Sequence, residues 1–307
     1  MALRIFEPEE VQEPAGLVMV LYGGSDVGKT TLACSGASVL HQDFDRKAYR
    51  AARRAQRIEF INWIQDRPSK EELAGLLADK TITAIDTVGR MLECMMSGLI
   101  ADNPDNARKS GEPSRQGYGA LKSTVMSYMR DIQEAKPGIN ILLLAHSTEE
   151  IGAKDQLVEK LYISGGFRNE SGWLSDQTGL MIKAESDPDA NGETNVERYV
   201  DFRYKQGRSV KDNAGLGLVK LGDPNDSDVA DMLFSKLGEG IMEAQRENAA
   251  VSLRRKKLTE AVGNVTGPED LTSLAKVAAE EPPALKKIIA NRAAAEGWTW
   301  QNGQFQA

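Results

Sequence analysis

A run of eight residues, Gly23 to Thr30, has the chemistry of a phosphate-binding loop. It reads Gly-Gly-Ser-Asp-Val-Gly-Lys-Thr and fits the pattern G-x-x-x-x-G-K-[ST]. Glycines let a backbone curl around phosphates without Cβ clashes, the lysine contacts the β- and γ-phosphates, and the threonine hydroxyl coordinates Mg²⁺. The pattern therefore predicts a nucleotide-binding chain with ATP and Mg²⁺ as cofactors. The residues expected to hold them are Gly23, Gly24, Ser25, Asp26, Val27, Gly28, Lys29, Thr30 and Thr31.

Asp86 is the second residue expected at the metal. It ends the run Thr81–Asp86, and acidic groups at the carboxyl ends of parallel strands face the ligand crevice of a sheet. A carboxylate in this place orients Mg²⁺, usually through water, because the ion keeps most of its hydration shell. The alternative is an aspartate that only ends a strand. We expect Thr30 and Asp86 to be the metal residues.

Two further strand ends supply candidates for hydrolysis. Asp43 and Asp45 end the run that begins at Val39, and a carboxylate there could align an attacking water. Asp45 is favoured because its side chain leaves the strand end, but the alternative that both aspartates only cap a turn stays open. His146 follows the most continuous apolar run, 139–145, and could hydrogen-bond the γ-phosphate, with a buried core histidine as the alternative.

These residues need a parallel sheet to bring them together, and the hydrophobic pattern predicts one. The run Leu17–Tyr22 suits a buried strand before the loop, and a helix follows the loop. A capping box at Ser69 starts another helix. The expected fold class is therefore α/β, with a mostly parallel central sheet flanked by helices. Further strands are predicted at 39–46, 57–63, 81–86, 139–145, 179–184, 198–205 and 216–221, and helices at 69–78, across 121–132 and from 226 onwards.

Two stretches without periodicity, 101–118 and 147–172, combine basic with aromatic residues. Such a composition suits phosphate contacts together with base stacking on single-stranded nucleic acid. The alternative is an ordinary solvated loop, which composition alone favours. The residues expected to contact DNA are Arg108, Lys109, Arg115, Lys154, Lys160, Phe167 and Arg168.

Length, charge and cysteine content narrow the class of protein. A chain of 307 residues can bury a full α/β core with room for a small second unit. A net charge of −7 argues against coating nucleic acid with the whole surface, yet leaves local basic loops free to bind it. Cys34 and Cys94 have neither metal-site nor disulfide spacing, which fits a reducing compartment. Because no apolar run approaches the ~20 residues that span a bilayer, we expect a soluble, cytoplasmic protein with no membrane partner.

Five of these segments together resemble RecA-like ATPases. The resemblance covers about residues 15–222 and is closest to the phage-encoded single-RecA-core proteins grouped as the fourth class of Sak single-strand annealing proteins. It implies a RecA-like P-loop ATPase core at 1–222 and a helical C-terminal appendage at 223–307 that ends in an aromatic hairpin, in the cytoplasm of the host cell. The segments are Gly23–Thr30, Asp43–Arg46, Thr83–Thr87, Leu143–His146 and Gly207–Gly217.

The resemblance also implies roles for individual residues. The catalytic glutamate of the relatives falls on Asp45 here, and the shorter side chain leaves the water about one methylene further away, so slow hydrolysis, or none, is expected. In such relatives a basic hairpin reaches the γ-phosphate of the neighbouring subunit. That role falls to Lys205, Arg208 and Lys211, with a solvated hairpin as the alternative.

The same resemblance implies partners and leaves rivals open. The two irregular stretches, 101–118 and 147–172, fall where the relatives have their DNA-binding loops. The activity that the resemblance implies is a DNA-stimulated ATPase that acts in phage recombination by annealing or strand pairing. The implied partners are single-stranded DNA, further copies of the chain in a ring or filament, and a single-strand-binding protein. One rival is a P-loop phosphotransferase acting on a small molecule, although no arginine-rich lid stands out. The other is a nucleotide-gated interaction module that does not hydrolyse ATP, which Asp45 permits.

Overall fold

A computed structural model describes residues 6–151, 157–163, 175–185, 196–206, 208–223, 228–280 and 282–307 of the chain. The chain divides into two compact units. Glu13–Ile241 form the first unit, and Met1–Gln12 together with Met242–Ala307 form the second. The long helix α7 (Val229–Gly263) contributes residues to both units.

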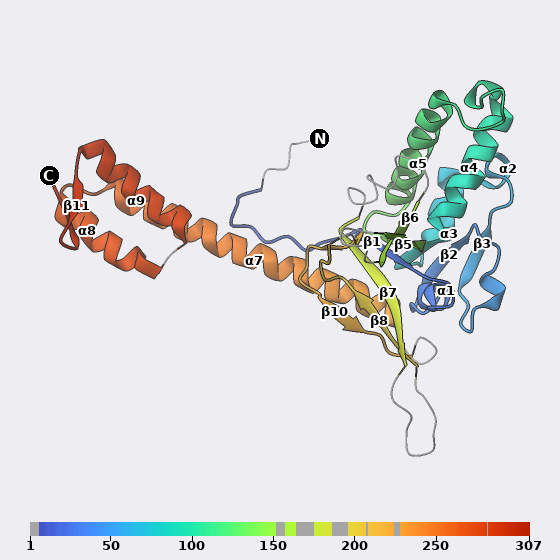
Figure 1. The fold of residues 1–307 in the computed structure, drawn as a ribbon, viewed down its shortest axis with the longest axis horizontal. Helices are drawn as coiled ribbons and strands as arrows, with labels where there is room; N and C mark the ends of the chain where they lie inside the picture. The colour runs from blue at the N-terminus through green and yellow to red at the C-terminus, as the bar shows by residue number, and fades with distance from the viewer. Residues whose placement is uncertain are drawn as a thin grey trace, which may run out of the picture. The chain divides into compact units, whose positions relative to one another are not determined.

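A ten-stranded sheet forms the centre of the first unit (Figure 1). Its strand order is β10-β8-β7-β1-β5-β4-β2-β3, with β6 paired to β5 and β9 to β7. The pairings among β7, β1, β5, β4, β2 and β3 are parallel, whereas β6, β8, β9 and β10 pair antiparallel. The strands are β1 (Val18–Gly23), β2 (Val39–Asp43), β3 (Gln56–Glu59), β4 (Ile82–Asp86), β5 (Asn140–Ile151), β6 (Leu157–Tyr162), β7 (Gln177–Glu185), β8 (Val196–Asp201), β9 (Lys211–Asp212) and β10 (Leu218–Lys220).

Helices cover both faces of this sheet, which explains why its central strands are continuous apolar runs. Tyr22 and Leu143 point to one face, where they pack in a core that includes Trp63 of α2 and Tyr128 of α5. Leu21 and its neighbours on the other face pack against α1 and the start of α7. Besides the start of α7, the described residues of the first unit form α1 (Lys29–Ala33), α2 (Trp63–Asp66), α3 (Lys70–Leu77), α4 (Val88–Asp102) and α5 (Arg115–Ala135), with short 3₁₀ helices η1 (Ala48–Arg50) and η2 (Pro104–Asn106).

The parallel strands bring the predicted site residues to one edge of the sheet. Gly23 of β1 lies in register with His146 of β5, and Asp43 of β2 lies in register with Asp86 of β4. Because β5 lies between β1 and β4, His146 lies between Asp86 on one side and, on the other, the loop that follows Gly23. This arrangement is what the chemistry of a phosphate site at strand carboxyl ends requires.

The predicted fold class is confirmed: the central sheet is mostly parallel, helices flank it, and a helical region follows at the C-terminal end. The predicted capping box is present at the start of α3. The Ser69 hydroxyl accepts from the Glu72 amide, and the Glu72 carboxylate accepts from the Ser69 amide. Local capping chemistry was therefore a reliable guide to this helix.

Three predicted segments differ in the structure. The strand expected to end before His146 continues to Ile151 and pairs with β6, so 147–172 is irregular only in part. The irregular stretch expected at 101–118 is shorter, because α4 extends to Asp102 and α5 begins at Arg115, and the connection between them contains η2. The strand expected at 198–205 ends at Asp201. The extension of β5 consists largely of polar residues and depends on pairing with β6, so the pattern of apolar runs could not predict it.

The second unit is a small helical assembly with its own core. The distal part of α7, α8 (Pro268–Val277) and α9 (Pro283–Glu296) surround a cluster that includes Val262, Leu271 and Ile289. A hairpin of β11 (Thr299–Gln301) and β12 (Gln304–Gln306) follows, with η4 (Ala278–Glu280) between α8 and α9. The rings of Trp300 and Phe305 meet edge to face with centroids 4.8 Å apart. Among the described residues, none of the helices has the length and apolar character to cross a membrane.

Candidate nucleotide-binding site

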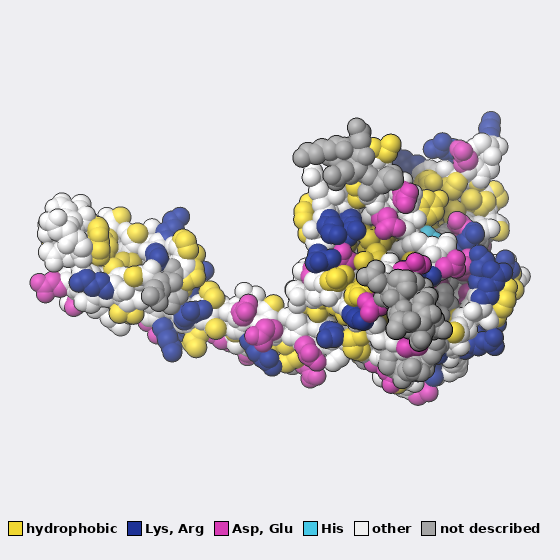
Figure 2. Space-filling model, turned by 60° about the horizontal axis from the view of Figure 1, so that its bottom comes forward, with side chains coloured by type: hydrophobic (Ala, Val, Ile, Leu, Met, Phe, Trp, Pro, Cys, Tyr) yellow, Lys and Arg dark blue, Asp and Glu magenta, His cyan; other side chains and the backbone are white. Residues whose placement is uncertain are grey.

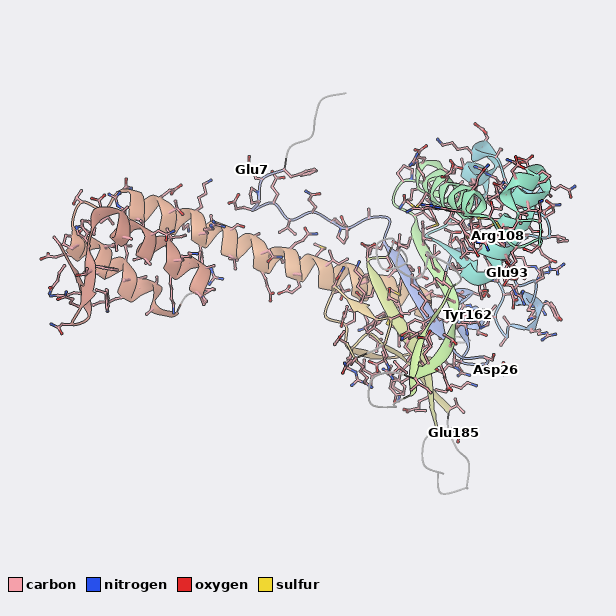
Figure 3. All side chains as sticks on the ribbon, turned by 45° about the horizontal axis from the view of Figure 1, so that its top comes forward. Glu7, Asp26, Glu93, Arg108, Tyr162 and Glu185 are labelled. Carbon is pink, nitrogen blue, oxygen red and sulfur yellow. The ribbon has the colours of Figure 1, made fainter. Side chains whose placement is uncertain are left out.

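The loop between β1 and α1 has the geometry of a phosphate cradle. Gly28 adopts a φ of +93°, which strongly favours glycine, and Asp26 a φ of +63°. Open space surrounds Gly24, where an added Cβ would meet nothing within 4 Å. Asp26 is exposed at the tip of the loop, where Figure 3 labels it. The helix that follows is short, since α1 contains five residues, so the loop amides rather than a long helix dipole must provide most of the attraction for an anion.

Lys29 is buried and held by the loop itself. Its side-chain ammonium donates to the carbonyl oxygens of Gly23 and Gly24 at 2.9 and 2.7 Å. Burial lowers the pKa of Lys29, while the carboxylates of Asp86, Asp26 and Asp45 oppose this shift. A lysine ammonium has three N–H donors, so two are used by the loop and one remains for a phosphate oxygen. The side chain is fixed where the bound phosphates must lie.

Thr30 and Asp86 lie close enough to share one metal ion. The Thr30 hydroxyl donates to Asp86 Oδ2 at 2.6 Å, and the two residues come from elements separated by 56 positions in the chain. A hydroxyl and a carboxylate are the hard oxygen ligands that Mg²⁺ prefers, with water and phosphate oxygens completing its octahedron. The donor set therefore fits Mg²⁺. Among the described residues, no cluster of three or more His, Cys, Asp or Glu side chains could hold a metal ion.

His41 is a member of this site that sequence reasoning missed. It lies on β2 with a relative exposure of 1%, and its Nε2 is 3.2 Å from Asp86 Oδ2. Burial disfavours a charged imidazole, but hydrogen bonds to Asp86 and Cys34 outweigh it and raise the pKa of His41 to about 10. A protonated His41 donates to Asp86. Only the pairing of β2 with β4 makes this contact, so no motif in the sequence marks it.

The structure separates the two candidate carboxylates for aligning water. Asp43 is fully buried, and its Oδ2 accepts from the Ala48 amide at 3.1 Å, as expected of a residue that caps a turn. Asp45 is partly exposed and lies between two cations, Lys47 at 3.4 Å and Arg90 at 3.3 Å. Of the two, only Asp45 has the access to solvent that a water-aligning group needs.

His146 lies where a group that senses the γ-phosphate would stand. It is partly buried in β5, in register with Gly23. Burial and then the positive charge of Lys29 lower the pKa of His146, so the imidazole is largely neutral at pH 7. A neutral imidazole offers one donor and one acceptor, and it can therefore hydrogen-bond either a phosphate oxygen or a water.

The three basic residues predicted to act on a neighbouring subunit are engaged within their own chain. Arg208 donates to Asp201 Oδ2 at 2.9 Å, and Lys205 lies 3.6 Å from the same oxygen. Lys211 donates to the carbonyl oxygen of Ser175. Arg203, which sequence reasoning did not select, donates to Asp201 Oδ1 at 2.8 Å. We call Asp201 with Arg203, Lys205 and Arg208 the Asp201 cluster.

Asp201 is the centre of this cluster. Its side chain is 1% exposed, whereas those of Lys205 and Arg208 are 52% and 19% exposed. Burial opposes ionisation, but hydrogen bonds from Arg203 and Arg208 outweigh it and lower the pKa of Asp201 to about 2. Of the three predicted residues, Lys205 is therefore the one with the exposure to reach a second molecule.

The residues predicted to contact DNA fall in separate places. Arg108 and Lys109 are exposed in the connection between α4 and α5, where Figure 3 labels Arg108, and Arg115 begins α5. Fifteen residues of α4 separate this connection from Thr87, about 22 Å of helix. Lys160 on β6 pairs with Glu150 at 2.7 Å. Lys154, Phe167 and Arg168 lie outside the described residues.

A basic edge lies closer to the loop. Figure 2 shows Lys and Arg side chains gathered at the side of the first unit that carries β2 and β3. Arg46, Lys47, Arg50, Arg54 and Arg57 are exposed in this segment, and the Arg50 guanidinium lies 5.4 Å from the ring centre of Tyr49. Tyr49 is 52% exposed. The segment joins positive charge to an accessible aromatic ring beside Asp45.

Comparison with known proteins identifies the family of this chain. Residues 15–207 match a family described as AAA domain. Among solved structures, the chain is similar to a KaiC-like protein from the hyperthermophilic archaeon Pyrococcus horikoshii OT3, with 14% identity, 68% of this chain and 91% of that chain covered, and a TM-score of 0.35. At that TM-score the similarity supports no argument about function. None of the curated proteins matches the chain.

Proposed function

Because this chain belongs to the AAA domain family, we propose that it binds ATP together with Mg²⁺ at the loop Gly23–Thr30 and hydrolyses it. The observation that carries the proposal is the 2.6 Å contact between the Thr30 hydroxyl and Asp86, directly beside the buried Lys29. A hydroxyl, a carboxylate and an ammonium converging at a glycine-rich loop are what a magnesium-bound triphosphate needs.

Each residue would have a distinct task. Lys29 would direct its remaining N–H to the phosphates, and Thr30 and Asp86 would hold Mg²⁺, which neutralises charge on the transferred group. Asp45 would orient the attacking water from its place between Lys47 and Arg90, with a side chain one methylene shorter than the glutamate of RecA-like relatives. His146 would hydrogen-bond the γ-phosphate or that water. We therefore expect slow turnover.

Single-stranded DNA is the partner we propose for this ATPase, in phage recombination by annealing or strand pairing. The basic edge at Arg46–Arg57 supports this proposal, because cations and an exposed Tyr49 suit the backbone and bases of a single strand. The connection that carries Arg108 and Lys109 is a second candidate contact. By contrast, the described part of β5 and β6 carries Glu149, Glu150 and Glu159, which repel phosphates.

We also propose that the protein works as an oligomer in which Lys205 reaches the γ-phosphate of a neighbouring copy. Its side chain is half exposed, and its ammonium lies 3.6 Å from Asp201 Oδ2, a loose ion pair that can be exchanged for a phosphate. Supplying positive charge from another subunit would make hydrolysis depend on assembly. Ring and filament are both compatible with this proposal.

One assay separates the proposed function from its rivals. ATP turnover is measured for the purified chain with Mg²⁺, with and without single-stranded DNA, and with EDTA as the control for metal dependence. The proposal predicts slow turnover that needs Mg²⁺ and rises with single-stranded DNA. Turnover only after addition of a small metabolite would identify a phosphotransferase instead. ATP binding without turnover under every condition would identify a nucleotide-gated module.

A salt titration tests the DNA partner separately. If the basic edge holds single-stranded DNA, affinity should fall steeply with salt, and Arg50→Ala together with Arg54→Ala should weaken binding. Arg130→Ala, at an exposed position on α5, is the matched control. Salt-independent binding, or equal loss in the control, would exclude this edge as the DNA site.

A further inference from the structure

Arg198 is a basic residue of the sheet that no motif marks. It lies on β8, where the register places it directly opposite Lys183 of β7. Two like charges at opposed positions of an antiparallel pair are unfavourable. The chain thus places two cations side by side, one on β7, which pairs with the loop-bearing β1, and one on β8 beyond it, an arrangement that folding alone does not reward.

The Arg198 side chain lies against the phosphate loop. A Cβ atom added at Gly28 would stand 3.1 Å from Arg198 Nε, 3.4 Å from its Cδ and 3.9 Å from its Cζ. Gly28 is the last residue before Lys29, and its φ of +93° turns the loop so that this face of the backbone meets the arginine. The guanidinium therefore lies over the same loop whose interior holds the Lys29 ammonium.

The charge of Arg198 is not compensated in the described part of the chain. Its Nε is buried and has no hydrogen-bond partner. No ion pair joins its guanidinium to a carboxylate among the described residues, in contrast to Arg203 and Arg208, which both meet Asp201. A buried donor without a partner costs free energy comparable to a lost hydrogen bond, so such a group is expected to have a partner in the functional state.

An anion on the loop would supply that partner. Arg198 approaches Gly28 from outside while Lys29 is held from inside by the carbonyls of Gly23 and Gly24. Arg198 therefore adds a second cation, without a carboxylate partner among the described residues, to the loop that carries Lys29. A planar guanidinium with N–H groups in a fork matches the oxygens of a phosphate.

We propose that Arg198 is a phosphate-binding residue of the nucleotide site, donating to the phosphate chain of a nucleoside di- or triphosphate held at Gly28 and Lys29. The inference rests on the proposed function, because it needs a nucleotide on this loop. It adds a residue from β8, 170 positions after Gly28, and so ties the antiparallel end of the sheet to ligand binding. Arg198 acts within its own chain, which distinguishes it from the basic residues proposed to act on a neighbour.

Equilibrium binding of ADP and of inorganic pyrophosphate tests this assignment without reliance on turnover. Titration calorimetry in Mg²⁺ compares the wild-type chain with Arg198→Gln, Arg198→Lys, Lys29→Ala and the control Arg130→Gln, which removes an exposed arginine of α5. Arg198→Gln should weaken both ligands by about tenfold or more, as expected for lost charge-assisted hydrogen bonds. Arg198→Lys should recover part of the loss, and Arg130→Gln should bind like the wild type.

Several outcomes would overturn the inference. Wild-type affinity for both ligands in Arg198→Gln would exclude a phosphate contact, and weakened ADP with unchanged pyrophosphate would place the arginine on the nucleoside instead. Two results together would assign the residue to folding. The free Arg198→Gln chain would melt well below the wild type, and a folded Arg198→Lys chain would bind both ligands with wild-type affinity. If the wild-type chain binds neither ligand, the proposed function itself fails. If only Lys29→Ala loses binding, the proposed function stands and the Arg198 inference fails.

Discussion

The phosphate loop and the Asp201 cluster both gather cations on one sheet, but they balance charge in opposite ways. At the loop, Lys29 is bonded to carbonyl oxygens and Arg198 has an unpartnered buried Nε. In the Asp201 cluster, three cations meet a single buried carboxylate. Cations without a carboxylate partner mark a place for an anionic ligand, whereas cations held by a buried carboxylate mark a structural element that can act on a ligand only after an ion pair is exchanged.

The largest effect should come from removing the lysine of the loop. Lys29→Ala should lower ATP turnover by about 100-fold or more, because the ammonium stabilises charge on the transferred phosphoryl group. The fold should be kept, since the side chain bonds only to carbonyls of the loop. Steady-state turnover and the melting temperature are measured in parallel, with the exposed Lys70→Ala as the control. Wild-type turnover in Lys29→Ala would remove the loop from the mechanism.

Asp201→Asn should show the opposite profile, with a loss of stability and little change in nucleotide affinity. The lowered pKa of Asp201, about 2, corresponds to about 2 kcal/mol of stability at pH 7 relative to an ordinary aspartate. Urea unfolding of the variant at pH 7 should report a loss of this size. If stability is unchanged while ADP affinity collapses, the cluster belongs to the ligand site and the comparison with the loop is wrong.

Lys205→Ala tests whether the cluster also acts on a neighbouring copy. The variant should bind ATP normally and lose turnover by about tenfold or more, because charge on the phosphoryl oxygens would lack its partner in the adjacent subunit. Mixing Lys205→Ala with Lys29→Ala should restore part of the activity at shared interfaces. The exposed Arg203→Ala provides the matched control. A mixture without recovery, together with full turnover in Lys205→Ala alone, would show that the cluster is only structural.

The smallest effect concerns pH. A carboxylate with a lowered folded pKa contributes stability that is fully present above its unfolded value near 4 and is lost as the pH falls towards about 2. The stability difference between wild type and Asp201→Asn should therefore shrink by about 1 kcal/mol from pH 7 to pH 3. Urea midpoints across this range measure it. A difference that stays constant, or grows, on acidification would contradict the ion pairs assigned to Asp201.

The sequence predicted the phosphate loop and its companions because short-range patterns encode them. Gly23–Thr30 and Asp86 are specified by spacing and by their position after apolar runs, and the strand register places Gly23, His146 and Asp86 along one edge. The choice of Asp45 over Asp43 also followed from position along a strand. Parallel strands carry this information because their carboxyl ends meet at the same edge.

Other features could not be predicted because they depend on pairing between distant segments. His41 contacts Asp86 only through the pairing of β2 with β4, and Arg198 meets Gly28 only through the antiparallel addition of β8. The polar continuation of β5 to Ile151 is stabilised by β6 and lacks an apolar run. Side-chain partners such as Asp201 for Arg208 are likewise invisible in a single sequence.

The central claim, that a nucleotide binds at the loop because its cations lack carboxylate partners, is tested most directly by a crystal structure of the chain with ADP and Mg²⁺. The phosphates should lie at Gly24–Thr30, with the free N–H of Lys29 and the guanidinium of Arg198 directed at their oxygens and the metal beside Thr30 and Asp86. A nucleotide bound elsewhere on the protein, or phosphates at the loop with Arg198 turned away from them, would contradict the account.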